Sequence, residues 1–115
     1  MIVLGIDPGS RRCGYGAVSQ AGSRFEVVES GVLAPGDKLP MGERLAAIWN
    51  GLEAVIRRAG AAEIAVESVF AGISVRSAIA LGQARGVVLA AAAHARLPIF
   101  EYAPAQIKLA VTGSG

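Results

Sequence analysis

The chain has 115 residues, of which 53% are apolar and 17% are charged, enough for one folded domain with a single core but too few for two. The longest apolar stretch, 86–95, is too short to cross a membrane, and the lone Cys13 excludes a disulfide scaffold and suits a reducing cytoplasm. A net charge of +2 permits a nucleic-acid partner without requiring one.

The N-terminal third predicts three strands in an antiparallel meander. Residues 2–6 form a short run rich in β-branched side chains, which is typical of a strand buried on both faces. A proline and a glycine follow and end that strand. Residues 14–19 and 25–33 predict two further strands, joined by a turn at 21–23.

The remainder of the chain alternates helices with strands, which favours parallel additions to the same sheet. Apolar residues at helical spacing predict a helix from Pro40 to about Ala59, with Gly60 as its terminator. The elements expected after it are a buried strand at 63–67, a helix at 74–95, a strand at 98–102 and a short helix at 104–111. The predicted fold class is α/β, with a mixed sheet that is antiparallel at one side and parallel at the other.

Two acidic residues close two of the predicted buried strands. Asp7 follows the apolar run 3–6, and Glu67 follows the run 64–66. Open α/β sheets bind ligands at the carboxyl edge, and if these strands are neighbours, about 5 Å apart, their carboxylates converge. Two such anions repel unless one is protonated or a cation lies between them, and Mg²⁺ prefers oxygen ligands of this kind. The alternative is that each acid hydrogen-bonds loop amides, which is the better interpretation for either acid alone.

The turn after Asp7 has the most specific pattern in the chain. Residues 5–16 are Gly-Ile-Asp-Pro-Gly-Ser-Arg-Arg-Cys-Gly-Tyr-Gly. A Gly-Ile-Asp-x-Gly-Ser/Thr turn resembles the first phosphate-binding turn of the actin, Hsp70 and sugar-kinase ATPases, but those proteins need two such domains and several hundred residues. The whole segment is similar, at every fixed position, to the opening of the RuvC-type Holliday-junction resolvases.

Three later segments, 66–70, 80–86 and 100–108, resemble the same family in order and spacing, so the resemblance covers the chain. It implies an RNase H-like fold and a Mg²⁺-dependent endonuclease, with Mn²⁺ as a substitute, that resolves four-way DNA junctions in recombination and repair. The resemblance also implies a homodimer making paired nicks and a branch-migration helicase as a partner. We expect residues 1–115 to form one truncated nuclease domain.

The resemblance assigns Asp7 and Glu67 to the metal-binding catalytic acids. Asp7 would bind or bridge two metal ions, and Glu67 would bind at least one. The family has two further aspartates, three residues apart on a C-terminal helix and therefore on one helix face. This chain ends before that helix, so we expect little cleavage from it alone. Among its other acids, Glu101 lies at a strand end, where we expect structural hydrogen bonding.

Candidate DNA contacts come mostly from the resemblance. Phe70 would stack on or separate bases at the junction centre, and its alternative is a buried core side chain. Lys108 would meet a phosphate, and its alternative is a solvated surface lysine. Weaker candidates for backbone contacts, which must cluster at the acidic edge to qualify, are Arg11, Arg12, Arg76 and Arg85.

The predicted helix at 74–95 carries a stripe of small residues, Ala78, Gly82, Gly86 and Ala90. The stripe permits close packing against the sheet, which is the default, or against a partner's helix, as the family suggests. Two alternatives to a nuclease remain open: a nucleotide-binding domain of the ATPase type, and a non-catalytic module that binds junctions or dimerises.

Overall fold

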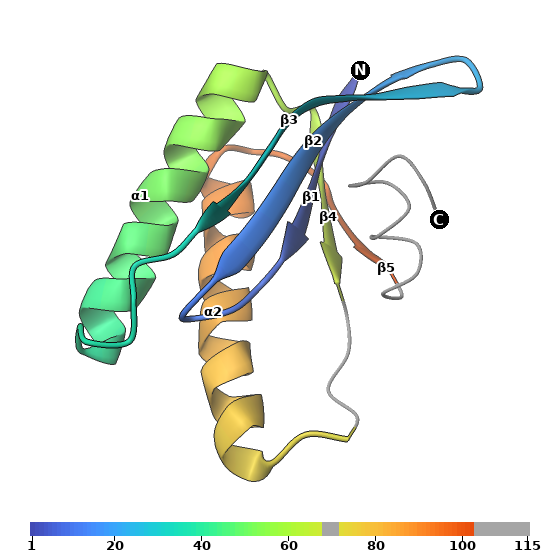
Figure 1. Cartoon of the computed structure of the whole chain (residues 1–115). Helices are drawn as coiled ribbons and strands as arrows, with labels where there is room; N and C mark the ends of the chain where they lie inside the picture. Colours follow the sequence, from blue (N-terminus) through green and yellow to red (C-terminus); the bar gives the residue numbers. More distant parts are fainter. Residues whose placement is uncertain (68–71, 103–115) are drawn as a thin grey trace.

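The computed structural model describes residues 1–67 and 72–102 (Figure 1). Its elements in chain order are β1 (Ile2–Asp7), β2 (Cys13–Ala21), β3 (Arg24–Leu33), α1 (Met41–Ala59), β4 (Glu63–Glu67), α2 (Val75–His94) and β5 (Ile99–Tyr102). Each begins and ends within two residues of its predicted bounds. The short helix predicted at 104–111 lies outside the described residues. None of the described helices is long and apolar enough to cross a membrane.

The strands form one mixed sheet in the order β3-β2-β1-β4-β5 (Figure 1). β1 pairs with β2 and β2 with β3 in antiparallel fashion, which confirms the predicted meander. Gly22, with φ +64°, makes the turn between β2 and β3 in a backbone conformation that favours glycine. β4 and β5 are parallel additions on the other side of β1, as the alternation of helices and strands predicts.

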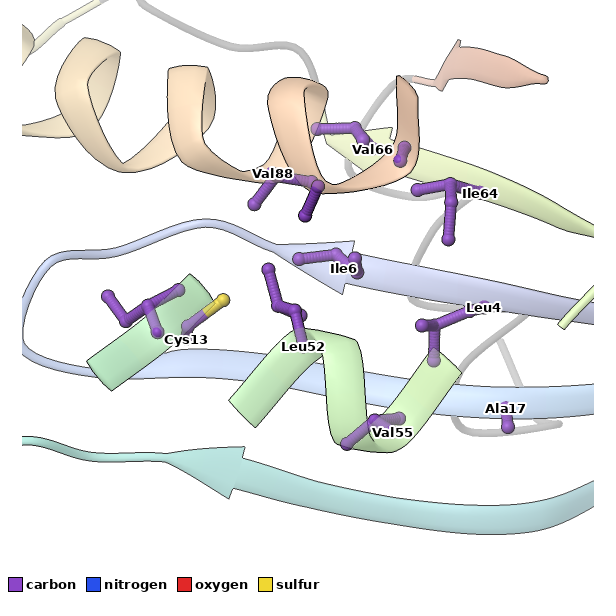
Figure 2. Packing of buried hydrophobic residues seen from close by; sticks show 12 residues of the cluster. Leu4, Ile6, Cys13, Ala17, Leu52, Val55, Ile64, Val66 and Val88 are labelled. Atoms are coloured by element: carbon purple, nitrogen blue, oxygen red, sulfur yellow. The ribbon is translucent and has the colours of Figure 1, made fainter. Parts of the chain in front are cut away.

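Both helices cover the same face of the sheet, and the core lies between them and that face. The sheet residues pointing into the core, Leu4, Ile6, Ile64 and Val66, are at most 1% exposed. Figure 2 shows them directed toward side chains of α1 and α2 such as Leu52, Val55 and Val88. Because side chains alternate along a strand, Asp7 and Glu67 lie on the sheet face away from the helices.

The middle of the sheet is also buried on that second face, where Val18 and Ala65 are each 3% exposed. The prediction of a strand buried on both faces is therefore confirmed at the centre of β1 and β4. Burial falls at the carboxyl ends of these strands: Asp7 is exposed and Glu67 is half-buried. The two acids thus mark the places where buried strands reach the edge of the sheet.

The loop between β1 and β2 is folded tightly on itself. A Cβ atom on Gly9 would lie 2.3 Å from the carbonyl oxygen of Arg12, so only glycine fits there without a backbone shift. Ser10 is only 9% exposed. Burial raises the pKa of the Cys13 thiol to about 11, with the charge of Asp7 acting in the same direction and a hydrogen bond from Gly9 opposing it. Cys13 is therefore a protonated core residue and not a nucleophile.

The close approach of Gly9 and Arg12 generates a prediction about stability. Gly9→Ala should lower the free energy of unfolding by about 1–3 kcal/mol, because backbone atoms must move to admit the methyl group. Gly42→Ala in α1 is the matched control: nothing lies within 4 Å of its added Cβ, and we expect it to stabilise the helix by about 0.5–1 kcal/mol. Urea unfolding followed by circular dichroism measures both, and effects of equal sign would contradict this account of the loop.

Candidate active site and the adjoining basic groove

Asp7 and Glu67 occupy adjacent positions on neighbouring strands. β1 and β4 pair in parallel, with Leu4 opposite Ile64 and Ile6 opposite Val66. The same register continued by one residue places Asp7 beside Glu67, which are the last residues of the neighbouring strands β1 and β4 (Figure 1). Adjacent strands lie about 4.8 Å apart, so the two carboxylates share one face at the carboxyl edge of the sheet.

The Asp7 carboxylate is not engaged by the protein around it. It is exposed, and within residues 1–67 and 72–102 it makes no hydrogen bond and no ion pair. The alternative in which Asp7 is a strand-end residue bonded to loop amides therefore finds no support. On its other flank Asp7 pairs with Gly14 of β2, where an added Cβ would lie 3.9 Å from the Asp7 Cβ. Glycine at this position keeps a side chain from standing beside the carboxylate.

Two adjacent carboxylates fit a hard divalent cation that takes its remaining ligands from water and phosphate oxygens. They do not make a complete protein cage. No group of three or more His, Cys, Asp or Glu residues suitable for a metal ion occurs among the described residues. All nine acidic residues of the sequence fall within the described ranges. Among them, Asp7 and Glu67 are the two that lie next to each other at the carboxyl ends of β1 and β4.

The arginines of the first turn meet an arginine of α2 on the other side of the loop. Arg11, Arg12 and Arg76 line one open groove of about 630 Å³, between the loop, the start of α1 and the first half of α2. Arg44, from the first turn of α1, lines it as well. The other lining residues are Gly9, Ser10, Met41, Ser77, Ile79, Ala80, Leu81 and Gln83, so no acidic residue in the described part of the chain faces this groove.

Arg44 is the site residue that the sequence analysis missed. Its Nη1 donates to the Oγ of Ser10 over 3.5 Å, and its Nε is buried without a hydrogen-bond partner among the described residues. No motif surrounds it in the sequence. A basic residue in the first turn of a helix, where acids are favoured, is the one signal that singles it out.

Arg85 was a weaker candidate for DNA backbone contact, and the structure makes that prediction wrong. Its side chain is only 16% exposed and forms an ion pair with Glu101 of β5. The pair ties α2 to the edge of the sheet, so Glu101 has the structural role expected of it. Phe70 and Lys108, the two contacts taken from the family resemblance, lie outside the described residues.

Glu29 of β3 also has a structural role. It accepts hydrogen bonds from the Nε of Arg58 at 3.1 Å and from the hydroxyl of Tyr15 at 3.0 Å. The hydrogen bond from Arg58, followed by that from Tyr15, lowers the pKa of Glu29. These contacts fasten the edge strand to the end of α1.

The small-residue stripe of α2 faces away from the sheet. The residues that pack on the sheet are Ala84, Val88, Ala91 and Ala92. A Cβ added to Gly82 or Gly86 would meet nothing within 4 Å, and Val75 and Ile79 on the same side are 77% and 60% exposed. Sheet packing, the default expectation for the stripe, is therefore wrong for these glycines.

Comparison with known families and with curated relatives points to one family of nucleases. The family model described as crossover junction endodeoxyribonuclease RuvC matches residues 3–115. The RuvC proteins of an Anaeromyxobacter species and of Anaeromyxobacter dehalogenans are each 68% identical over all of this chain, and that of Chlorobaculum parvum is 48% identical. The chain spans 56–62% of the length of these relatives.

Solved structures agree in fold. The chain is similar to RuvC of T. thermophilus in complex with Holliday junction substrate, with a TM-score of 0.85, 32% identity and coverage of 94% of this chain and 69% of that one. The yeast mitochondrial Holliday junction resolvase Ydc2 (TM-score 0.60, 14% identity) and an Aquifex aeolicus Ppx/GppA phosphatase (TM-score 0.52, 11% identity) share the fold alone. The RNase H-like fold is thereby confirmed.

Proposed function

Because this chain belongs to the RuvC family of crossover junction endodeoxyribonucleases, we propose that it forms part of a metal-dependent nuclease that resolves four-way DNA junctions. One observation carries the proposal: Asp7 and Glu67 stand side by side at the carboxyl edge, and no described residue engages Asp7. Two strand-end carboxylates that lie close together repel unless one is protonated or a cation lies between them, and such a cation could act on a phosphodiester backbone.

In this proposal Asp7 and Glu67 would supply oxygen ligands for Mg²⁺, with Mn²⁺ as a substitute. By resemblance to the family, Asp7 would bind or bridge the metal ions. Bound metal would supply an activated water and neutralise charge on the scissile phosphate. The remaining carboxylate ligands would come from outside these 115 residues, as the greater length of the relatives allows. The protein would act in the cytoplasm, where a buried free thiol such as Cys13 stays reduced.

Contacts to the DNA would come from both sides of the loop. Arg11, Arg12 and Arg76 share one groove and would bind backbone phosphates, whose contacts position a protein on DNA without reading its sequence. By resemblance to the family, Phe70 would stack on bases at the junction centre and Lys108 would meet a phosphate near the acids. By the same resemblance, a branch-migration helicase would be a protein partner.

Removing the charge of Asp7 tests the catalytic assignment. In a protein of the relatives' full length that carries this chain, Asp7→Asn should lower the rate of junction cleavage in Mg²⁺ by about 100-fold or more, the loss typical for one electrostatic contributor. Junction binding should remain, because the side chain keeps its shape. Asp37→Asn, at an exposed loop position with the same charge change, is the control and should cleave normally. An Asp7→Asn protein that still nicks a synthetic junction would remove Asp7 from the active site.

The 115-residue chain by itself should bind a junction and cut it little or not at all. Two of its acids reach the candidate site, and that number leaves a two-metal site short of ligands. Incubation of purified chain with a labelled four-way junction and Mg²⁺, resolved on a denaturing gel, measures this. Robust Mg²⁺-dependent nicking would show that the described residues hold a complete site.

We further propose that the chain forms a homodimer through the exposed side of α2. Val75, Ile79, Gly82, Gly86 and Ala90 recur at helical spacing on that side, and glycines without neighbours allow two backbones to approach closely. The symmetry of such a dimer would present two acidic edges to opposed strands of a junction.

A substitution at Gly86 separates dimer contact from folding. Gly86→Glu should shift the chain to monomers in sedimentation velocity, because a charged side chain would enter the helix–helix contact. The fold should remain, because a Cβ added at this exposed position meets nothing within 4 Å. Gly42→Glu, at the open glycine of α1, should leave the distribution unchanged. A wild-type chain that stays monomeric at every concentration, or a Gly86→Glu chain that still dimerises, would refute this interface.

A further inference from the structure

Arg44 is half-buried, and its guanidinium has few hydrogen-bond acceptors among the described residues. Its Nε is shielded from solvent without a partner in the described part of the chain, and its one hydrogen bond, to Ser10, is long at 3.5 Å. Ser10 is itself 9% exposed and is the one buried polar residue among those described. A buried Nε–H without an acceptor is destabilising unless an ion or water completes its hydrogen bonds.

The surroundings of Arg44 favour an anion as the missing partner. Arg11, Arg12 and Arg76 line the same groove, and none of the four arginines forms an ion pair with a described residue. The arginines that do have carboxylate partners, Arg58 and Arg85, lie outside the groove. The first turn of α2, which also borders the groove, contains no acid and adds its own positive end. Four cations held together without a counter-charge repel one another, and a bound anion would relieve that repulsion.

We propose that this groove is a second DNA-binding site, separate from the acidic edge, in which Arg44 and Ser10 hold one backbone phosphate and the three flanking arginines guide the strand. The proposal rests on the proposed junction-binding function. A guanidinium is matched to phosphate because it donates two parallel hydrogen bonds to two oxygens. The loop that starts at Asp7 lines the groove with Gly9–Arg12, so a strand in the groove would pass beside the acids.

The experiment is junction binding by fluorescence anisotropy in EDTA, so that no metal-dependent cleavage intervenes, with the salt concentration varied from about 50 to 200 mM. Arg44→Gln should raise the Kd about tenfold and lower the slope of log K against log salt by about 0.9, the value for one lost phosphate contact. Arg57→Gln is the matched control: it removes the same charge from an exposed position at the far end of α1 and should change neither quantity.

Arg44→Lys should keep the salt slope while losing part of the affinity, since the charge remains and the two-pronged geometry is lost. If Arg44→Gln raises the Kd but keeps the wild-type slope of log K against log salt, Arg44 only supports the loop and the proposal is wrong. If Arg44→Gln does not fold, as judged by circular dichroism, Arg76→Gln at an exposed position takes its place. An unchanged salt slope for Arg76→Gln would then refute the proposal.

Two further outcomes separate this inference from neighbouring ideas. If inorganic phosphate saturates the groove in an NMR titration and junction DNA does not displace it, the site serves free phosphate and the DNA assignment is overturned. If the wild-type chain binds no junction at all, the proposed function itself fails. If the wild-type chain binds the junction and the Arg44 and Arg76 variants bind it equally well, the groove is not a DNA-binding site, but the proposed function still stands.

Discussion

The register between β1 and β4 is the constraint on which the candidate site depends. Leu4, Ile6, Ile64 and Val66 all point into one core, and burying each contributes about 1.5–3 kcal/mol. A slip of one residue in either strand would turn its apolar set to the wrong face. The packing of the helix side therefore fixes, on the other side, the position of Asp7 beside Glu67. The repulsion between the two carboxylates is small against that packing energy, so the fold can hold them together before any cation arrives.

Local patterns were enough to predict this part of the site, because the apolar runs, the acids that end them and the turn after Asp7 are all contiguous in the sequence. The arginines required the tertiary structure. Arg44 reaches Ser10 only because α1 packs with its first turn against the loop, 34 residues away in sequence. The partner of Arg85 likewise depends on β5 lying beside β4. The orientation of α2 was ambiguous for another reason: the helix is rich in alanine and apolar nearly all round, so its periodicity does not separate the side facing the sheet from the exposed glycines.

The loop at 8–12 separates charges of opposite sign that lie close in sequence. Asp7 stands at its start and Arg11 and Arg12 near its end, yet no described residue forms an ion pair with Asp7. An arginine paired to that carboxylate would occupy the oxygens that a metal ion needs. The tight turn at Gly9 instead directs the loop residues toward the groove and leaves the acid at the edge. DNA binding by the arginines and metal binding by Asp7 would therefore take place on different sides of the loop at 8–12. Removing a charge on one side should for that reason leave the function of the other side unchanged.

α2 connects these features with the proposed dimer. One side of the helix, with Val88 and Ala91, completes the core that sets the strand register. Its first half lines the groove with Arg76 and Ile79, and Ile79 also belongs to the exposed apolar side. A partner helix packed on that side would therefore border the groove and exclude water from part of its wall. Because charge-assisted hydrogen bonds strengthen as water is removed, dimerisation and phosphate binding would reinforce each other through this helix. The spacing of two junction strands would then be set by the same element that places the acids.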